Sequence, residues 1–166
     1  MLERCLIRTL CAASVVCASG ASFAEIPEAI AAPDEFALLT THAQGAQIYE
    51  CKPGPDGKLA WSFREPVASL FDKGETVGRH YRGPTWELVD SSLVTGRVTA
   101  NAPGATPQDI PWLRLEVVNR LGTGKLTGAT TVQRINTKGG VMQGPCAAEG
   151  ALLSAPYSTD YVFLKK

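Results

Sequence analysis

The residues that could carry chemistry gather most densely between positions 78 and 90. This stretch holds one of the chain's two histidines, with a tyrosine, a tryptophan, a glutamate and two arginines, and a Gly-Pro pair divides it into two strand-like runs. Aromatic rings can stack on a sugar or another flat apolar ligand, while Arg and Glu fix the ligand's orientation. The candidate ligand-binding residues are His80, Tyr81, Arg82, Trp86 and Glu87.

The same stretch could instead serve catalysis. A hydrolase centred here would use His80 with Glu87 or Asp90, with or without a metal ion. However, the chain contains no Gly-x-Ser-x-Gly nucleophile motif, and His42 and His80 do not have the spacing of metal ligands. We therefore assign no catalytic residue and no metal ligand, and we favour a non-catalytic domain.

A glycine-rich segment at positions 122–125 resembles half of a phosphate-binding loop. The complete motif needs a glycine at position 119 and a serine or threonine after Lys125, but the chain has Asn119 and Leu126 there. No helix is predicted to follow, so the segment is interpreted as a turn between strands. No cofactor is predicted.

Composition narrows the class of protein. The chain has 166 residues, which suits one domain, and its formal net charge of zero gives no basic excess for binding nucleic acid. The first residues have the pattern of a secretory signal: Arg4 and Arg8, a short apolar run, and small residues before a cleavage point after Ala24. That run is too short to span a membrane. The prediction is a signal peptide at 1–24 and a single β domain at 25–166, periplasmic or secreted, without a transmembrane segment after signal removal.

Removal of that signal simplifies the cysteines. Only Cys51 and Cys146 remain in the mature chain, an even pair in an oxidising compartment. We predict that they form one disulfide.

The elements that must position the candidate site are short strands. Leu59–Arg64 and Trp112–Leu121 alternate large apolar residues with polar ones, which is the period of a half-buried strand. Turns follow every few residues, with breaks expected at Gly45 and Pro66, and no helical periodicity is present. These features predict an all-β, single-domain antiparallel β-sandwich or barrel of about ten short strands. Trp61 and Phe63 are predicted to lie in its core, and the Ala/Pro-rich segment 25–34 on its surface.

Several motifs also resemble a known family. They are Gln47-Ile48-Tyr49-x-Cys51, His80-Tyr81-x-Gly83-Pro84-Thr85-Trp86-Glu87, Ile110-Pro111-Trp112-Leu113 and Gln133-Arg134-x-Asn136-Thr137-x-Gly139-Gly140. Over nearly the whole mature chain they resemble the secreted bacterial and fungal proteins of the domain of unknown function 3455 family. The resemblance implies a single secreted domain and supplies no catalytic residues. Some fungal members are labelled malate dehydrogenase, but this chain lacks the βαβ unit and glycine fingerprint that a nicotinamide cofactor needs.

Three hypotheses of function follow. The favoured one is an exported β domain that binds a small molecule, a glycan or an envelope component without catalysis. The second is a secreted hydrolase or metal-dependent enzyme centred on His80 and Glu87. The third is a structural or interaction protein of the cell envelope.

Overall fold

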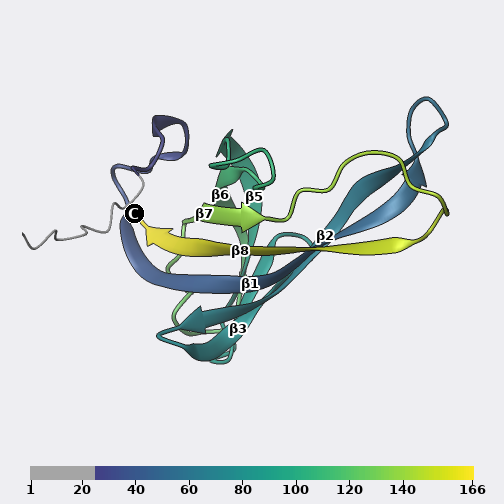
Figure 1. Cartoon of the computed structure of the whole chain (residues 1–166). Coiled ribbons are helices and arrows are strands. Elements are labelled where there is room, and N and C mark those ends of the chain that lie inside the picture. Colours follow the sequence, from purple (N-terminus) through teal and green to yellow (C-terminus); the bar gives the residue numbers. More distant parts are fainter. Residues whose placement is uncertain (1–24) are drawn as a thin grey trace, which may run out of the picture.

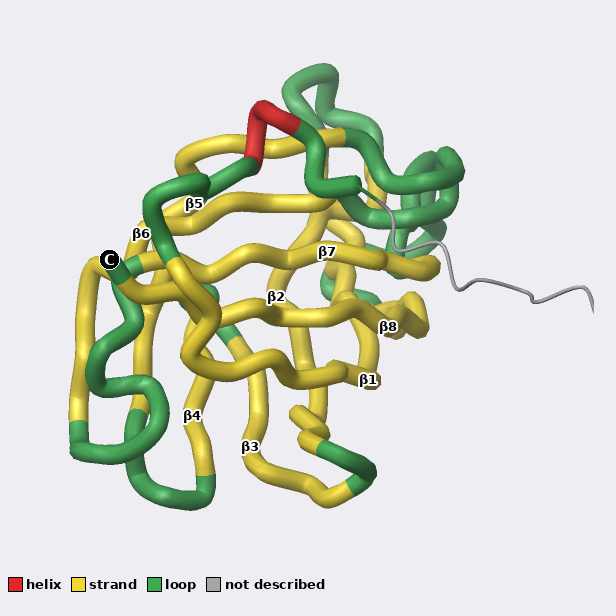
Figure 2. Tube along the Cα trace, turned by 90° about the vertical axis from the view of Figure 1, so that its left-hand side faces the viewer, coloured by secondary structure: helices red, strands yellow, loops and turns green. Residues whose placement is uncertain are grey.

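The protein folds as a closed barrel of eight antiparallel strands (Figures 1 and 2). The computed structural model describes residues 25–166, and the predicted signal peptide lies outside them. The strands are β1 Phe36–Pro53, β2 Leu59–Asp72, β3 Glu75–Tyr81, β4 Thr85–Leu88, β5 Leu93–Ala102, β6 Trp112–Leu121, β7 Thr131–Gly139 and β8 Leu152–Lys165. Each strand pairs with the next along the chain, and β8 pairs with β1 to close the barrel. The all-β prediction is confirmed, and the described residues contain no helix long and apolar enough to cross a membrane.

The strands are fewer and longer than predicted, because two expected breaks lie inside continuous strands. At Gly45 the chain stays extended within β1, and a Cβ at this position would lie 2.0 Å from the Val67 carbonyl oxygen of β2. The glycine is therefore needed for close approach of two strands and does not end one. Pro66 is tolerated within β2 because the pairing of β2 with β3 starts only at Ala68.

The up-and-down order gives the barrel two different ends. The β1–β2, β3–β4, β5–β6 and β7–β8 connections lie at one end, called here the open end, and the other three connections lie at the closed end. At the closed end, the β6–β7 connection inserts the fully buried Leu126 into the core. Asp90 accepts a hydrogen bond from the Lys125 backbone N–H at 2.8 Å, so a carboxylate already occupies the loop that resembled a phosphate site.

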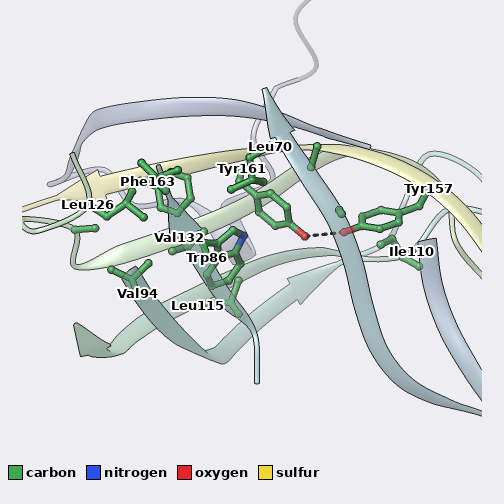
Figure 3. Packing of buried hydrophobic residues seen from close by; sticks show 14 residues of the cluster. Leu70, Trp86, Val94, Ile110, Leu115, Leu126, Val132, Tyr157, Tyr161 and Phe163 are labelled. Carbon is green, nitrogen blue, oxygen red and sulfur yellow. Dashed lines mark hydrogen bonds between the residues drawn. The ribbon is translucent and has the colours of Figure 1, made fainter. Parts of the chain in front are cut away.

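Apolar side chains from all around the barrel fill its interior (Figure 3). They alternate with outward-facing residues along each strand, as a half-buried strand requires. Large members of this core are Leu70, Trp86, Val94, Leu115, Val132, Tyr161 and Phe163. The interior is thus packed toward the closed end.

A second apolar cluster lies outside the barrel, under the N-terminal segment. A short 3-10 turn, η1 (Glu28–Ile30), lies over β5 and β6, and Ile30 packs with Ala102 and Trp112 at 0% exposure (Figure 2). Gln133 of β7 donates a hydrogen bond from Nε2 to the Ile30 carbonyl oxygen at 2.7 Å. The prediction of a surface segment was therefore wrong for Ile30, which is buried against the barrel wall.

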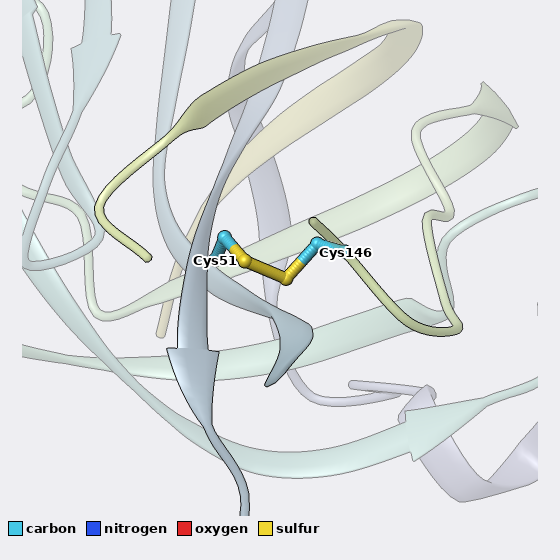
Figure 4. The surroundings of a disulfide bond; sticks show 2 residues. All are labelled: Cys51 and Cys146. Carbon is cyan, nitrogen blue, oxygen red and sulfur yellow. A yellow bond between two sulfur atoms is a disulfide. The ribbon is translucent and has the colours of Figure 1, made fainter. Parts of the chain in front are cut away.

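The predicted disulfide is confirmed between Cys51 and Cys146 (Figure 4). It joins the end of β1 to the β7–β8 connection, where the β1–β2 hairpin extends beyond the barrel (Figure 1). Backbone hydrogen bonds support the same junction, from Trp61 N–H to the Gly144 oxygen at 3.1 Å and from Cys146 N–H to the Leu59 oxygen at 3.2 Å. The cross-link thus holds one side of the open end together.

Substitution of Gly45 should strongly destabilise the protein. The Cβ of Gly45→Ala would collide with backbone atoms of β2, which cannot move aside without opening the barrel. We expect the free energy of unfolding, measured in urea, to fall by about 3 kcal/mol or more. Gly54→Ala is the matched control, because its Cβ would meet its nearest neighbour at 3.4 Å and should change stability little. Equal effects of the two substitutions would contradict this account.

Removal of the disulfide should also lower stability. The bond spans 95 positions of sequence, so its loss frees a long loop in the unfolded chain. The Cys51→Ala/Cys146→Ala double variant should unfold with a free energy lower by about 2–5 kcal/mol. Reduced wild-type protein is the control and should match the double variant. A denaturation midpoint that does not respond to reduction would show that the bond adds nothing.

Candidate functional site

A cavity of about 310 Å³ lies inside the open end of the barrel. Its walls are mainly apolar and come from all eight strands and two connections. The apolar lining residues are Tyr49, Phe63, Pro66, Pro84, Trp86, Val98, Ile110, Pro111, Leu113, Leu115 and Tyr161, and the polar ones are Gln47, Arg64, His80 and Arg134. Apolar walls with a few polar groups are typical of small-molecule sites.

A stack of two rings forms one wall of this cavity. His80 on β3 and Trp86 on β4 are direct cross-strand partners, and their rings lie parallel with centroids 4.6 Å apart. The ring of Tyr161 meets the Trp86 ring edge-on at 5.2 Å. Gly96 on β5 makes room for this arrangement, since a Cβ there would lie 3.1 Å from the Trp86 ring. The Trp86 ring is therefore packed between His80, Tyr161 and Gly96.

His80 is a neutral imidazole in this site. It is 3% exposed, and its Nδ1 lies 2.9 Å from the Thr85 carbonyl oxygen. Because a carbonyl can only accept, Nδ1 carries the proton and Nε2 is left as an acceptor. Burial lowers the pKa of His80 from 6.5 to about 3, against the opposing effect of the bond to Thr85, and the charge of Arg134 lowers it further.

Two buried hydrogen-bond donors at the cavity have no partner among the described residues. They are the amide nitrogen Nε2 of Gln47 and the indole nitrogen Nε1 of Trp86. Both side chains line the cavity, with Gln47 3% and Trp86 1% exposed. A buried donor without a partner costs about 1–3 kcal/mol. Among the described residues, Thr41 Oγ1 and Trp112 Nε1 also lack a partner, and neither residue lines the cavity.

Arg134 is one of the two arginines that line the cavity. It lies on β7, where it pairs in register with Leu113 on one side and Tyr161 on the other. Its Nε and Nη2 donate hydrogen bonds to the Pro111 carbonyl oxygen at 3.0 and 2.8 Å. Among the described residues, no carboxylate forms an ion pair with Arg134, and no acidic side chain lines the cavity.

Comparison with known proteins agrees with the resemblance seen in the motifs. The family model described as "Protein of unknown function (DUF3455)" matches residues 32–165, which include every strand of the barrel. The chain belongs to the DUF3455 family. No curated protein and no solved structure matches it. The chemistry of this DUF3455 domain must therefore be argued from its own geometry.

The barrel divides the candidate residues between its two faces. His80 and Trp86 point inward, whereas Tyr81 and Glu87 lie on the outer face, where the Tyr81 hydroxyl donates to Glu87 Oε2 at 2.8 Å. Hydrogen bonds from Tyr81 and from Arg79 lower the pKa of Glu87. The hydrolase hypothesis requires His80 and Glu87 to meet, but the two side chains lie on opposite faces of the barrel wall.

The remaining charged candidates also lie apart from the cavity stack. Arg82 is bound on the outer surface to Glu65 at 3.2 Å, and Asp90 belongs to the closed end. The second histidine, His42, pairs on the outer surface with Asp160 at 2.8 Å. In residues 25–166, no group of three or more His, Cys, Asp or Glu side chains could hold a metal ion.

Sequence reasoning missed two polar residues of the DUF3455 cavity, Gln47 and Arg134. Both lie two positions from another inward-facing residue, Tyr49 for Gln47 and Val132 for Arg134, so strand periodicity carried a signal for them, but it could not tell which face was inside. The core prediction for Trp61 and Phe63 was wrong, since Trp61 is half-buried and Phe63 is 53% exposed. These rings lie where the β1–β2 hairpin extends past the barrel, and Phe63 forms part of the cavity mouth against Tyr49.

The burial of neutral His80 predicts a loss of stability in acid. The imidazole titrates near 6.5 in the unfolded chain and near 3 in the folded one. Between these values the unfolded chain binds more protons, so stability falls as the pH falls and is fully present above the higher value. Urea unfolding at about pH 4.5 should show a loss from this group of roughly 2–3 kcal/mol relative to about pH 7.5.

The His80→Gln variant is the control for this pH dependence. Glutamine does not titrate, whereas the carboxylates of the domain titrate alike in both proteins. The difference in unfolding free energy between wild type and variant should therefore shrink as the pH falls. A constant difference across this range would mean that His80 is not held neutral by burial.

Proposed function

We propose that this DUF3455 domain is an exported binding protein that holds one small molecule with a flat apolar body in the open end of its barrel. The observation that carries the proposal is the cavity itself, with apolar walls and two buried donors that have no partner. An eight-stranded barrel is just wide enough to hold one small ligand beside its packed core. A volume of about 310 Å³ lies at the lower end of the range for ligand pockets, so the ligand is small.

Binding is a better account of His80 than catalysis. Its ring stacks on Trp86, and the hydrogen bond to the Thr85 carbonyl fixes its position. A general base would need an acidic orienting group or a nucleophile within reach. Serine, cysteine, aspartate and glutamate do not occur among the residues that line the described cavity. We therefore interpret His80 as part of the ring wall against which a ligand packs.

The geometry also favours an enclosed small molecule over an extended glycan. A surface that stacks sugars needs rings that face solvent. Trp86, the largest ring of the candidate stretch, is 1% exposed inside the barrel. Export of the domain remains a proposal based on the signal-like residues 1–24, and the disulfide is consistent with an oxidising compartment.

Binding at the cavity can be tested with a neutral fluorescent probe, N-phenyl-1-naphthylamine, whose emission rises in apolar surroundings. The mature protein should bind one probe molecule. Val98→Arg should weaken binding by at least about tenfold, because Val98 lines the cavity and a long charged side chain there would fill it. The readout is a fluorescence titration with the variant's thermal melt beside it.

Val67→Arg is the matched control for this experiment. Val67 lies next to the lining residue Pro66 but faces outward, and its exposure of 54% is close to the 47% of Val98. Its substitution should leave probe affinity unchanged. Wild-type protein that binds no probe, or Val98→Arg protein that binds as well as wild type, would contradict the proposed function.

A further inference from the structure

We propose that the natural ligand is a small apolar monocarboxylate, with an aromatic or similarly flat body, whose carboxylate binds Arg134. This inference rests on the proposed function and names the chemical class of its ligand. Three features carry it: an arginine without an acidic partner, two hydrogen-bond donors of lining residues without a partner, and aromatic and apolar side chains beside them.

The first feature is the electrostatic state of Arg134. A guanidinium keeps its charge at any physiological pH, and its fork of donors matches a carboxylate. Here two of its nitrogens bind the uncharged carbonyl of Pro111, and the uncharged hydroxyl of Tyr161 is a further polar neighbour, so no acidic group balances its charge. Arg64, the other lining arginine, differs because it forms ion pairs with Glu65 at 3.1 Å and Glu50 at 3.8 Å.

The charge of Arg134 acts on the inner part of the cavity. It lowers the pKa of His80 and opposes the burial that raises the pKa of Tyr161, so its field reaches both rings. His80 is uncharged and adds no second cation. A ligand with one negative charge would therefore balance the cavity, whereas a cationic ligand would be repelled.

The second feature is the hydrogen-bonding character of the site. Two unpartnered groups of lining residues, Gln47 Nε2 and Trp86 Nε1, are donors, and His80 Nε2 is an acceptor. Arg134, on the same cavity wall, adds further donors. Carboxylate and carbonyl oxygens accept only, so they fit this set. An ammonium group donates only, so it would pair with none of these donors and would lie beside the charge of Arg134.

The third feature sets the body of the ligand. The His80–Trp86 stack and the side chains of Leu113 and Leu115 form a flat apolar wall. Flat rings pack well against such a wall, and the volume of about 310 Å³ limits the ligand to about two or three rings. A bicyclic aromatic acid is therefore a suitable probe.

The test compares 2-naphthoate with 2-naphthamide, which has the same shape without the charge, each displacing N-phenyl-1-naphthylamine from the mature protein. The carboxylate should bind at least about tenfold more tightly, as expected for hydrogen bonds to a charged group. In Arg134→Gln this preference should disappear, with the amide's affinity little changed. Arg134→Lys keeps the charge and should keep most of the preference. Arg97→Gln is the control, because Arg97 pairs with Glu116 on the outer face and should have no effect.

The outcomes separate this inference from the proposed function. Equal affinity of wild type for acid and amide would overturn the carboxylate assignment and leave the cavity as a binding site. A preference that survives Arg134→Gln, or is lost in Arg134→Lys, would also overturn it. If N-phenyl-1-naphthylamine and both naphthalene probes fail to bind, the proposed function itself is wrong.

Discussion

The pairing of β1 with β8 is the interaction on which the structure depends. These strands are 18 and 14 residues long and lie at opposite ends of the described chain. Their ladder turns an open sheet into a barrel, which removes both edges and encloses the core. Gly45 lies in this ladder and in the ladder with β2, opposite Tyr157 and Ala68, so the closest contact between strands occurs at a residue without a side chain. Without closure, neither the cavity nor its buried donors would exist.

Closure also decides what each residue of the candidate stretch can do. In a barrel, alternation along a strand separates inside from outside, so His80 and Tyr81 are neighbours in sequence but face different environments. The same holds for Trp86 and Glu87. The inner pair forms an aromatic wall, and the outer pair joins Arg79 in a surface hydrogen-bond network. The dense cluster of candidate side chains in the sequence is therefore two separate groups in space.

The sequence was sufficient for the properties that depend on local pattern. Period-two alternation and frequent turns predicted the all-β class, and the cysteines left after a predicted signal peptide gave the disulfide. Features set by distant contacts could not be predicted. The inward orientation of Arg134 depends on the register of β7 against β6 and β8. The exposure of Phe63 depends on how far the β1–β2 hairpin extends past the barrel. Gly45 shows the same limit, since only the approach of β2 distinguishes a close contact from a turn.

The two ends of the barrel differ in whether their buried polar groups have hydrogen-bond partners. At the closed end, the Asp90 carboxylate is satisfied by the backbone N–H groups of Ser92 and Lys125, and Leu126 seals the core. At the open end, Gln47 and Trp86 keep donors unpaired, at a cost of about 1–3 kcal/mol each. The disulfide holds this same end together and contributes a stabilisation of similar size, about 2–5 kcal/mol. The cross-link therefore offsets the cost of these unpaired donors. Under the proposed function, a ligand with acceptor atoms would bind without first having to order the cavity.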